Sequence, residues 1–329
     1  MNDSAVMKAA FVRSKGPTDQ IRYDDLPIPD VGPTDVLLRM EATTVNHVDL
    51  FVRSGAYQTP TPLPLILGRD VVGTVEQVGT HIEDVAVGQR VWSNSLGHDG
   101  RQGTFSQFVV APRERVYALP SAVDPLEAVS VLHAGATAHI GLFREARLCE
   151  GETVLVAGAG GAVGSAVAQM ARAAGARVIA TAAPRDFDRV LQRGADVVLD
   201  YNDRDLNAAI AAAAPQGIDV WWDNSGHNDL SAALPILRQR GRVILMAGMT
   251  TRPHFQAGSL YTRDLSILGF AISNASSTDL ADAAEAINTL LANGQLTGRV
   301  GQVLNLSQSR TAHELMEAGG HAGRIVVIP

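Results

Sequence analysis

A short apolar run leads into a glycine-rich turn, and a helix of small residues follows directly. The apolar run covers residues 153–157, the turn covers 158–161 and the helical pattern covers 162–174. A second apolar run follows at 177–182. A strand, a glycine turn, a helix and a second strand in this order form the βαβ unit that binds dinucleotides. No other feature of the chain limits its possible folds as strongly.

Three glycines of this fingerprint have separate physical roles. Gly158 allows the tight turn, Gly161 lets the backbone approach a pyrophosphate, and Gly164 lets the helix pack closely on the strand. The phosphates would lie at the helix N-terminus, where free N–H groups and the helix dipole favour negative charge. The alternative is a turn that needs glycine only for packing. The predicted phosphate-binding backbone is Gly158, Gly160, Gly161, Ala162, Val163 and Gly164.

The end of the second strand bears on which dinucleotide is bound. NAD enzymes of this type usually end it with an acidic residue that binds the ribose hydroxyls. Here the strand ends at Ala182, and Arg185 and Arg189 follow. Guanidinium groups suit a 2′-phosphate, so NADPH is the predicted cofactor, although Asp186 and Asp188 lie nearby. The alternative is that these arginines are solvated charges at the start of a helix.

Composition excludes several classes of function. The chain has 329 residues, enough for two domains, and its formal net charge of −7 argues against nucleic-acid binding. We find no apolar run that could span a bilayer and no signal segment, so we expect a cytoplasmic protein without a membrane partner. Cys149 is the only cysteine, which excludes intrachain disulfides and a cysteine-built zinc site.

The pattern of the chain changes twice, which suggests three segments. Residues 1–124 contain short strands separated by glycine and proline and predict an antiparallel, barrel-like domain. Residues 125–270 begin with a helix expected over 125–142 and then alternate strands with helices, which predicts a doubly wound parallel Rossmann sheet. Residues 271–329 are expected to return to the first domain. The fold class is therefore α/β, with a substrate cleft expected between the domains.

The apolar segment 265–270 is predicted to be an edge strand of the parallel sheet. An apolar edge is an aggregation liability unless it is paired or covered. We therefore expect a two-fold homodimer in which this strand pairs with its copy.

Short motifs in a fixed order extend along nearly the whole chain. They are Val45-Asn-His-Val-Asp49 with Arg53-Ser-Gly-Ala-Tyr57, Leu67-Gly-Arg-Asp-Val-Val-Gly-Thr-Val75, Gly103-Thr-Phe-Ser-Gln-Phe108, the turn at 158–164, and Gly194-Ala-Asp196 leading to Asp200-Tyr201. In this order and spacing they resemble the zinc-free quinone oxidoreductases of the zeta-crystallin type, which are medium-chain dehydrogenases/reductases. The resemblance implies a GroES-like β-barrel domain beside the Rossmann domain. It also implies hydride transfer from NADPH to a small quinone or α,β-unsaturated carbonyl compound.

The chain departs from the zinc-dependent members of that superfamily. Their catalytic zinc is bound by a cysteine near the position of Asn46, a histidine near Arg69 and a cysteine near His133. None of these ligand types is kept here. Asparagine and a permanently charged arginine cannot replace a thiolate and a neutral imidazole as zinc ligands, so we expect no metal.

Without a metal, an electron-poor acceptor still benefits from a hydrogen-bond donor on its oxygen. Asn46 is the first candidate, because its amide can bind either that oxygen or the nicotinamide ribose. Tyr57 is the second, because its phenol stays protonated at neutral pH. The alternatives are that Asn46 is a turn residue bonded to backbone and that Tyr57 is an aromatic side chain over a loop.

Further cofactor contacts are expected from the resemblance and from the ends of two parallel strands. The resemblance places Thr137 near the nicotinamide, Tyr201 at the adenosine phosphate, and Arg324 in the position of a C-terminal lysine. A buried helix threonine bonded to its own backbone is the alternative for Thr137. The strand ends contribute Asn224, Ser225, Ala247, Gly248 and Met249.

Two other functions fit the same sequence. One is a zinc-free carbonyl reductase or alcohol dehydrogenase, which would turn over aldehydes and ketones reversibly. The other is an NADPH-binding sensor or structural protein with little catalysis. The presence of both Asn46 and Tyr57 favours an enzyme, because a pure binding module has no evident need for both.

Overall fold

A computed structural model describes residues 5–329 of the chain. Its internal contacts divide it into two compact units. Unit 1 comprises the residues up to His133 together with Ala275–Pro329, and unit 2 comprises Ala134–Asn274. Within residues 5–329, no helix combines the length and apolar character needed to cross a membrane.

Unit 2 is built on a six-stranded parallel sheet in the order β11-β10-β9-β12-β13-β14. The chain enters at the centre with β9, moves outward to β11, and then crosses to the other half. This reversal of direction is the doubly wound Rossmann order, which confirms the expected fold class. The strands are β9 (Thr153–Ala157), β10 (Arg177–Ala182), β11 (Val197–Asp200), β12 (Ile218–Asp223), β13 (Leu237–Leu245) and β14 (Ser266–Gly269).

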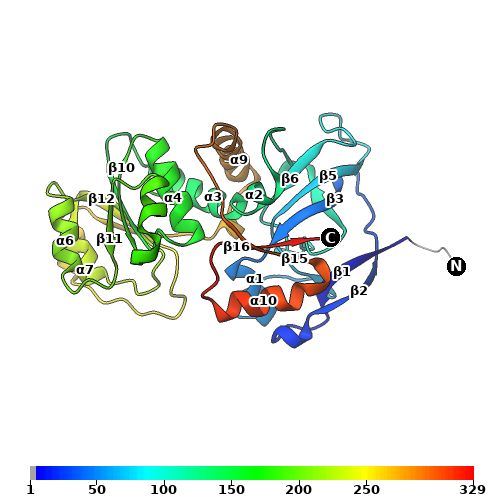
Figure 1. The fold of residues 1–329 in the computed structure, drawn as a ribbon, viewed down its shortest axis with the longest axis horizontal. Coiled ribbons are helices and arrows are strands. Elements are labelled where there is room, and N and C mark those ends of the chain that lie inside the picture. The colour runs from blue at the N-terminus through cyan, green and yellow to red at the C-terminus, as the bar shows by residue number, and fades with distance from the viewer. Residues whose placement is uncertain (1–4) are drawn as a thin grey trace. The chain divides into compact units, whose positions relative to one another are not determined.

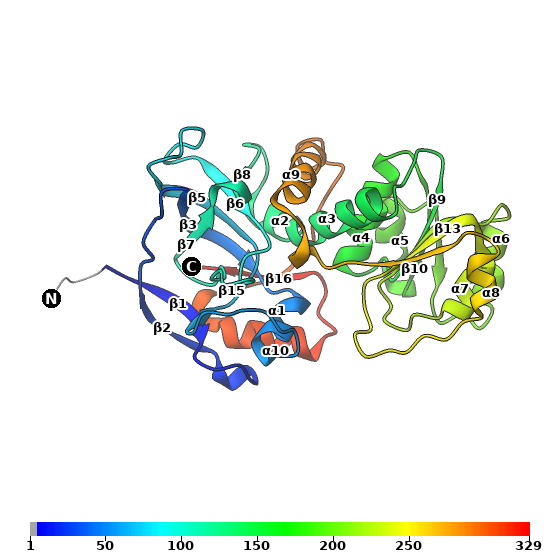
Figure 2. The ribbon, with the colours of Figure 1, turned by 180° about the vertical axis from the view of Figure 1, so that it is seen from behind.

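The helices of unit 2 cover both faces of this sheet. Crossovers between parallel strands are right-handed, so the helices change face where the strand order reverses. Helix α4 therefore lies on one face and helices α6 and α7 lie on the other, as Figures 1 and 2 show. Small residues on α4 let it lie close to β9 and β10, and Gly164 to Ala171 are all buried. The helices are α4 (Ala162–Ala173), α5 (Phe187–Gln192), α6 (Leu206–Ala213), α7 (Leu230–Ile236) and α8 (Ala257–Tyr261). β14 lies at the sheet edge, as predicted.

The single helix predicted over 125–142 is wrong. The chain instead forms α2 (Pro125–Val129), α3 (Leu132–His139) and a π-helical segment, Ile140–Glu145. The break has a local cause, because the N–H of Val131 donates to Ala128, three residues back, rather than continuing the helical ladder. The Ser130 hydroxyl also donates to the Glu127 carbonyl at 2.7 Å.

Unit 1 contains a larger, mostly antiparallel sheet in the order β15-β16-β3-β5-β6-β8, with β7 also paired to β3. A second sheet has the order β2-β1-β4. The long strand β3 pairs with β7 through its first half and with β16 through its second, and with β5 along its length. The strands are β1 (Val6–Val12), β2 (Arg22–Pro27), β3 (Asp35–Thr44), β4 (Leu65–Ile66), β5 (Val71–Val78), β6 (Arg90–Ser93), β7 (Phe108–Pro112), β8 (Tyr117–Ala118), β15 (Val300–Asn305) and β16 (Arg324–Ile328).

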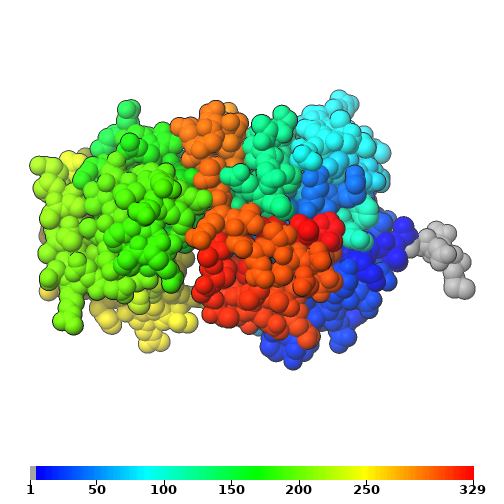
Figure 3. All heavy atoms as spheres, in the orientation of Figure 1, coloured from blue at the N-terminus to red at the C-terminus, as the bar shows by residue number. Residues whose placement is uncertain are grey.

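Within the described residues, unit 1 contains α2 and three further α-helices, two of which come from the C-terminal segment. The three are α1 (His47–Ser54), α9 (Ser277–Ala292) and α10 (Ser309–Ala318). In Figure 3 the orange-red atoms of the C-terminal segment form a continuous part of the surface of unit 1. The Trp92 indole donates to Asn288 of α9 at 2.9 Å, and Arg53 of α1 forms an ion pair with Glu317 of α10. These contacts fix the last part of the chain on the first.

Candidate functional site

The glycine turn of unit 2 has the geometry that a dinucleotide turn needs. Gly158 directly follows β9 and has φ of 80°, a left-handed conformation that glycine adopts without strain. Gly164 lies so close to this turn that a Cβ atom there would be 2.4 Å from the Gly158 carbonyl oxygen. The first helical turn is therefore held directly against the end of the central strand.

The N-terminus of α4 is open to a ligand. Gly161 is its N-cap residue, is exposed, and provides no side chain to cap the helix. The first N–H groups of an α-helix have no acceptor within the helix. In α4 these belong to Ala162, Val163 and Gly164. This backbone fits a pyrophosphate, which would accept those hydrogen bonds at the positive end of the helix dipole.

The ends of β12 and β13 present polar groups beside the same turn. The side-chain oxygen Oδ1 of Asn224 accepts a hydrogen bond from the Trp222 indole at 2.9 Å. The side-chain nitrogen Nδ2 of Asn224 is buried and has no partner within residues 5–329. A buried amide that lacks a partner is costly and points to a ligand or an ordered water. The Cβ of Asn224 lies 3.6 Å from the place of a Cβ on Gly158, so this amide adjoins the glycine turn.

The remaining predicted contacts at these strand ends are brought together by short loops. The Ser225 hydroxyl and amide both donate to Asp223, at 2.6 and 2.7 Å. Asn228 donates to the Ala247 carbonyl at 2.9 Å, and this bond joins the two loops. Gly248 follows with φ of 79°, and Met249 is 60% exposed. Thr137 is buried in α3, where only 3% of it is exposed.

The end of β10, where the sequence predicts the adenosine contacts, contains a carboxylate that the strand pattern does not reveal. β10 ends at the buried Ala182, but the 3₁₀ turn Pro184–Asp186 brings Asp186 back toward the glycine turn. Its carboxylate would lie 3.1 Å from a Cβ on Gly160. Arg189 forms an ion pair with it at 2.6 Å and also donates to the Gly160 carbonyl at 3.1 Å.

The two other side chains predicted at this end are open to solvent. Arg185 is 82% exposed, and its Nε lies 3.9 Å from the carboxylate of Asp186. Tyr201 is 50% exposed, and its backbone N–H donates to Ala182 at 3.3 Å, so it stands beside the end of β10. This corner therefore offers one exposed guanidinium, one guanidinium paired with a carboxylate, and one aromatic ring.

In unit 1, Asn46 is the centre of a buried polar network. It is the N-cap residue of α1, and its backbone N–H donates to Asp49 at 2.7 Å. Only 4% of Asn46 is exposed. Its Nδ2 donates to Asp70 at 2.6 Å, and its Oδ1 accepts from Arg324. Both ends of the amide are thus held by the protein itself.

Arg324 belongs to this network in unit 1. Its guanidinium donates to the Thr44 hydroxyl at 2.7 Å and to the Val45 carbonyl at 2.8 Å, besides the bond to Asn46. Burial lowers the pKa of Arg324, and the carboxylates of Asp70 and Asp49 oppose that shift. The structure therefore places this side chain, which sequence reasoning assigned to the cofactor, among buried groups of its own unit.

A second buried arginine compensates the two carboxylates of the network. Arg69 is 1% exposed and interacts electrostatically with Asp49 and Asp70. Burial raises the pKa of Asp49 to about 6, against the opposing charge of Arg69. Asp70 is fully buried and also contacts His133, with 3.2 Å between Oδ1 and Nδ1. Sequence reasoning did not identify this Asp70–His133 pair.

Tyr57 stands near this network. It lies close enough to Arg69 for the two side chains to interact electrostatically. The centroids of the Tyr57 and His98 rings are 5.8 Å apart. We find no hydrogen bond from its hydroxyl to any partner within residues 5–329. Burial and the charge of Arg69 lower the pKa of His98 to about 4, so this histidine is neutral at pH 7. The phenol is therefore available to a ligand.

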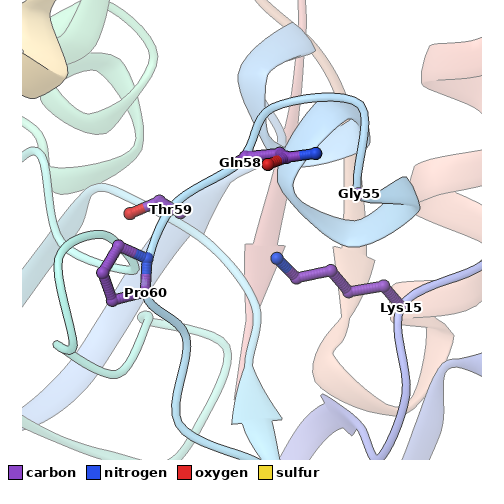
Figure 4. A pocket seen from close by; sticks show the side chains of 5 residues that line it. All are labelled: Lys15, Gly55, Gln58, Thr59 and Pro60. Atoms are coloured by element: carbon purple, nitrogen blue, oxygen red, sulfur yellow. The ribbon is translucent and has the colours of Figure 1, made fainter.

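An open hollow of about 430 Å³ adjoins the loop that follows Tyr57 (Figure 4). The Lys15 side chain extends across it toward the segment that contains Gln58 and Thr59. The hollow is lined by Lys15, Gly55, Gln58, Thr59 and Pro60. It contains one cationic side chain and no acid–base pair.

The described residues do not offer a metal-binding group. Within residues 5–329, no three histidine, cysteine or carboxylate side chains are arranged to hold a metal ion. At the positions compared above with zinc ligands, Asn46 and His133 are bonded to Asp70, and Arg69 carries its own positive charge.

Family models match two parts of the chain. Residues 32–121 match the alcohol dehydrogenase GroES-like domain, and residues 162–289 match the zinc-binding dehydrogenase domain. Quinone oxidoreductase of Sus scrofa is 31% identical over 318 residues, which cover 95% of this chain and 94% of that protein.

Two solved structures show the same fold over nearly the whole chain. An NAD-dependent alcohol dehydrogenase has a TM-score of 0.88 at 29% identity, covering 98% of this chain and 100% of that one. A mycobacterial protein in complex with NADPH has a TM-score of 0.84 at 29% identity, with the same coverage of 98% and 100%.

Proposed function

Because the chain belongs to the quinone oxidoreductase family of medium-chain dehydrogenases/reductases, we propose that it is a zinc-independent, NADPH-dependent reductase. Its acceptor is a quinone or an α,β-unsaturated carbonyl compound. The observation that carries this proposal is Arg69, a permanent cation buried beside Asp49 and Asp70. A guanidinium already supplies the charge that a metal ion would bring there.

The residues of unit 2 fit a nicotinamide dinucleotide. The backbone of Gly158–Gly164 would hold the pyrophosphate, and the unpaired Asn224 amide would bind the ribose or nicotinamide end. We assign the 2′-phosphate of NADPH to the exposed Arg185. The negative charge of Asp186 would repel a phosphate there, but Arg189 neutralises that charge through an ion pair at 2.6 Å. When bound, the cofactor supplies the hydride.

The chemistry that unit 1 provides supports this acceptor class. A quinone or an enone delocalises the charge that arrives with a hydride, so it needs no strong Lewis acid. The Tyr57 phenol is the hydrogen-bond donor that we assign to the acceptor oxygen. Asn46 is assigned a positioning role, because both ends of its amide are engaged with Asp70 and Arg324.

Steady-state oxidation of NADPH and NADH against quinones, enones and aldehydes, with EDTA present, tests this function. Turnover of quinones or enones with preference for NADPH supports it. Preferential turnover of aldehydes, with alcohol oxidation in reverse, would instead establish the carbonyl reductase alternative. NADPH binding without turnover of any acceptor would favour the sensor or structural alternative.

We also propose that the chain forms a two-fold homodimer through β14. This strand is the edge of the parallel sheet in unit 2, and its outer hydrogen-bonding side has no partner strand within residues 5–329. Light scattering over a dilution series checks this. A monomer at every concentration would exclude the dimer.

A further inference from the structure

Reduction of a quinone or an enone needs a proton as well as a hydride. Building on the function proposed above, we propose that His133 delivers this proton and that Asp70 orients it. The sequence motifs mark neither residue as an acid–base group, and the two lie 63 positions apart in the chain.

The contact between the two side chains defines which nitrogen exchanges the proton. Asp70 Oδ1 lies 3.2 Å from His133 Nδ1, and the carboxylate is fully buried. A buried carboxylate accepts a hydrogen bond, so Nδ1 carries a hydrogen and Nε2 is the atom that gains or loses a proton. The His133 side chain is 13% exposed, so the ring is not sealed inside the core.

Asp70 is itself held in one orientation. Its second oxygen, Oδ2, accepts from Asn46 Nδ2 at 2.6 Å. Asn46 is fixed in turn by Arg324 and by its place at the start of α1. Pairing of β16 with β3 anchors Arg324, because Val326 lies opposite Thr44. Four segments that are distant in sequence thus converge on one imidazole.

The charges around His133 balance one another. Asp70 faces it directly, and Asp49 is close enough for the two groups to interact electrostatically. Arg69 and Arg324 both interact with these two carboxylates. The carboxylate that faces the ring therefore belongs to a group of two acids and two guanidiniums. Histidine is the side chain best suited to exchange protons near neutral pH.

Neighbouring titratable groups are poorer proton donors. Burial and nearby arginines lower the pKa of His98 to about 4. Burial, together with the charges of Arg324 and His321, lowers the pKa of His47. Within residues 5–329, neither imidazole forms a hydrogen bond or ion pair with a carboxylate that would hold a proton on it. A phenol such as Tyr57 is a weak acid that serves better as a hydrogen-bond donor.

The proposed step balances as follows for an enone. The β-carbon gains a hydride, so a C–H bond forms there as one breaks at C4 of the reduced nicotinamide. The resulting enolate takes the proton from Nε2, which breaks the N–H bond of His133 and leaves it neutral. The acceptor gains two electrons, the nicotinamide loses two, and His133 regains a proton from water.

The test compares His133→Gln with the unchanged chain, using NADPH and a simple enone. Glutamine can still donate to Asp70 but cannot transfer a proton. We expect kcat to fall about 100-fold, the range typical of a lost general acid, while the Kd for NADPH and the Tm stay unchanged. The fall should be smaller with a quinone, because its reduced anion is less basic than an enolate.

Three further measurements separate proton delivery from a structural role. The pH profile of kcat should lose one ionisation in His133→Gln, and added imidazole should restore part of the activity of His133→Ala. Asp70→Asn should shift that ionisation. The exposed His81→Gln serves as the matched control and should keep both the rate and the pH profile.

The outcomes distinguish the two proposals. If the unchanged chain reduces enones but His133→Gln keeps its rate within threefold and the same pH profile, the role of His133 is overturned and the reductase function stands. If the unchanged chain reduces no acceptor although it binds NADPH, the reductase function fails, and the proton-delivery role fails with it.

Discussion

The glycine turn of unit 2 and the buried network of unit 1 are held together in opposite ways. The turn is local, since Gly158, Gly164 and the start of α4 are neighbours in sequence. The network joins Asn46, Asp70, His133 and Arg324 from four distant segments. The turn depends on backbone shape and the absence of side chains, whereas the network depends on charge compensation. Substitutions in the two regions should therefore fail for different reasons.

The largest effect is expected from Arg69→Met in the network. This change removes one of the two guanidiniums that interact with the buried carboxylates of Asp49 and Asp70. Removing one partner of a buried ion pair typically costs about 3 to 5 kcal/mol. Urea unfolding at pH 7 measures the loss. A second change, Asp49→Asn in the same chain, should return part of the stability; no recovery would mean that Arg69 acts by packing alone.

The pH dependence of that loss has a definite sign. The pKa of Asp49 is already raised by burial to about 6. A carboxyl with a raised pKa in the folded state contributes stability at low pH, and this contribution is lost as pH rises from about 4 to 6. Without Arg69 the pKa should rise further. The deficit of Arg69→Met should thus shrink at pH 5 compared with pH 8.

A smaller loss of stability but a complete loss of cofactor binding is expected from Gly164→Val. The added Cβ would lie 2.4 Å from the Gly158 carbonyl oxygen, so the turn must shift. Overpacking of this kind costs about 1 to 3 kcal/mol. NADPH binding by fluorescence and thermal unfolding check both parts. Gly258→Ala, where no atom lies within 4 Å of the new Cβ, is the control.

His313 offers a third test, of a buried imidazole that packs against the Phe105 ring but has no hydrogen-bond partner within residues 5–329. It is fully buried on α10, and neither ring nitrogen has a hydrogen bond within residues 5–329. Burial and the charge of Arg53 lower its pKa to about 3. A lowered histidine pKa means that stability is present above pH 6.5 and falls as the pH drops toward 3.

The magnitude of the His313 effect follows from that difference. At pH 5 the unfolded state gains about 2 kcal/mol from protonation that the folded state does not share. Between pH 7.5 and pH 5, the free energy of unfolding should therefore fall less for His313→Leu than for the unchanged chain, as measured by urea unfolding. An identical slope in both chains would contradict the assigned pKa.

The smallest effect is expected at the group of charged residues beside the end of β10, which includes Arg185, Asp186 and Arg189. Arg185→Ala should raise KM for NADPH about tenfold, equivalent to about 1.4 kcal/mol, and leave KM for NADH unchanged. Steady-state kinetics with both cofactors measure the ratio. The exposed Arg22→Ala in unit 1 provides the control. Equal changes with both cofactors would show that Arg185 does not contact the 2′-phosphate.

The difference between local and long-range contacts also explains which features the sequence could predict. The bounds of β9 and β10 agree with the predicted 153–157 and 177–182. The reason is that an apolar run ended by glycine or by a polar turn is a local signal. The helix predicted over 125–142 was wrong because its break depends on a single three-residue hydrogen bond at Val131.

The site was harder to predict because its contacts are non-local. Asn46 was identified, but its bonds to Asp70 and Arg324 depend on how β3, β5 and β16 pair. Asp186 lies only four residues beyond the strand end, yet the turn at Pro184 is needed to bring it to Gly160. The signal for His133 was weak, since only its acidic partner distinguishes it from an ordinary helix histidine.

The function proposed for this chain is hydride transfer from NADPH to a conjugated acceptor without a metal. The most direct measurement uses NADPH that carries deuterium at both C4 positions, a simple enone, and protein treated with EDTA and checked for zinc. We expect one deuterium at the β-carbon of the product, a solvent proton at the α-carbon, and a rate unchanged by the chelator. Unlabelled product, or a rate that vanishes with EDTA and returns with zinc, would contradict it.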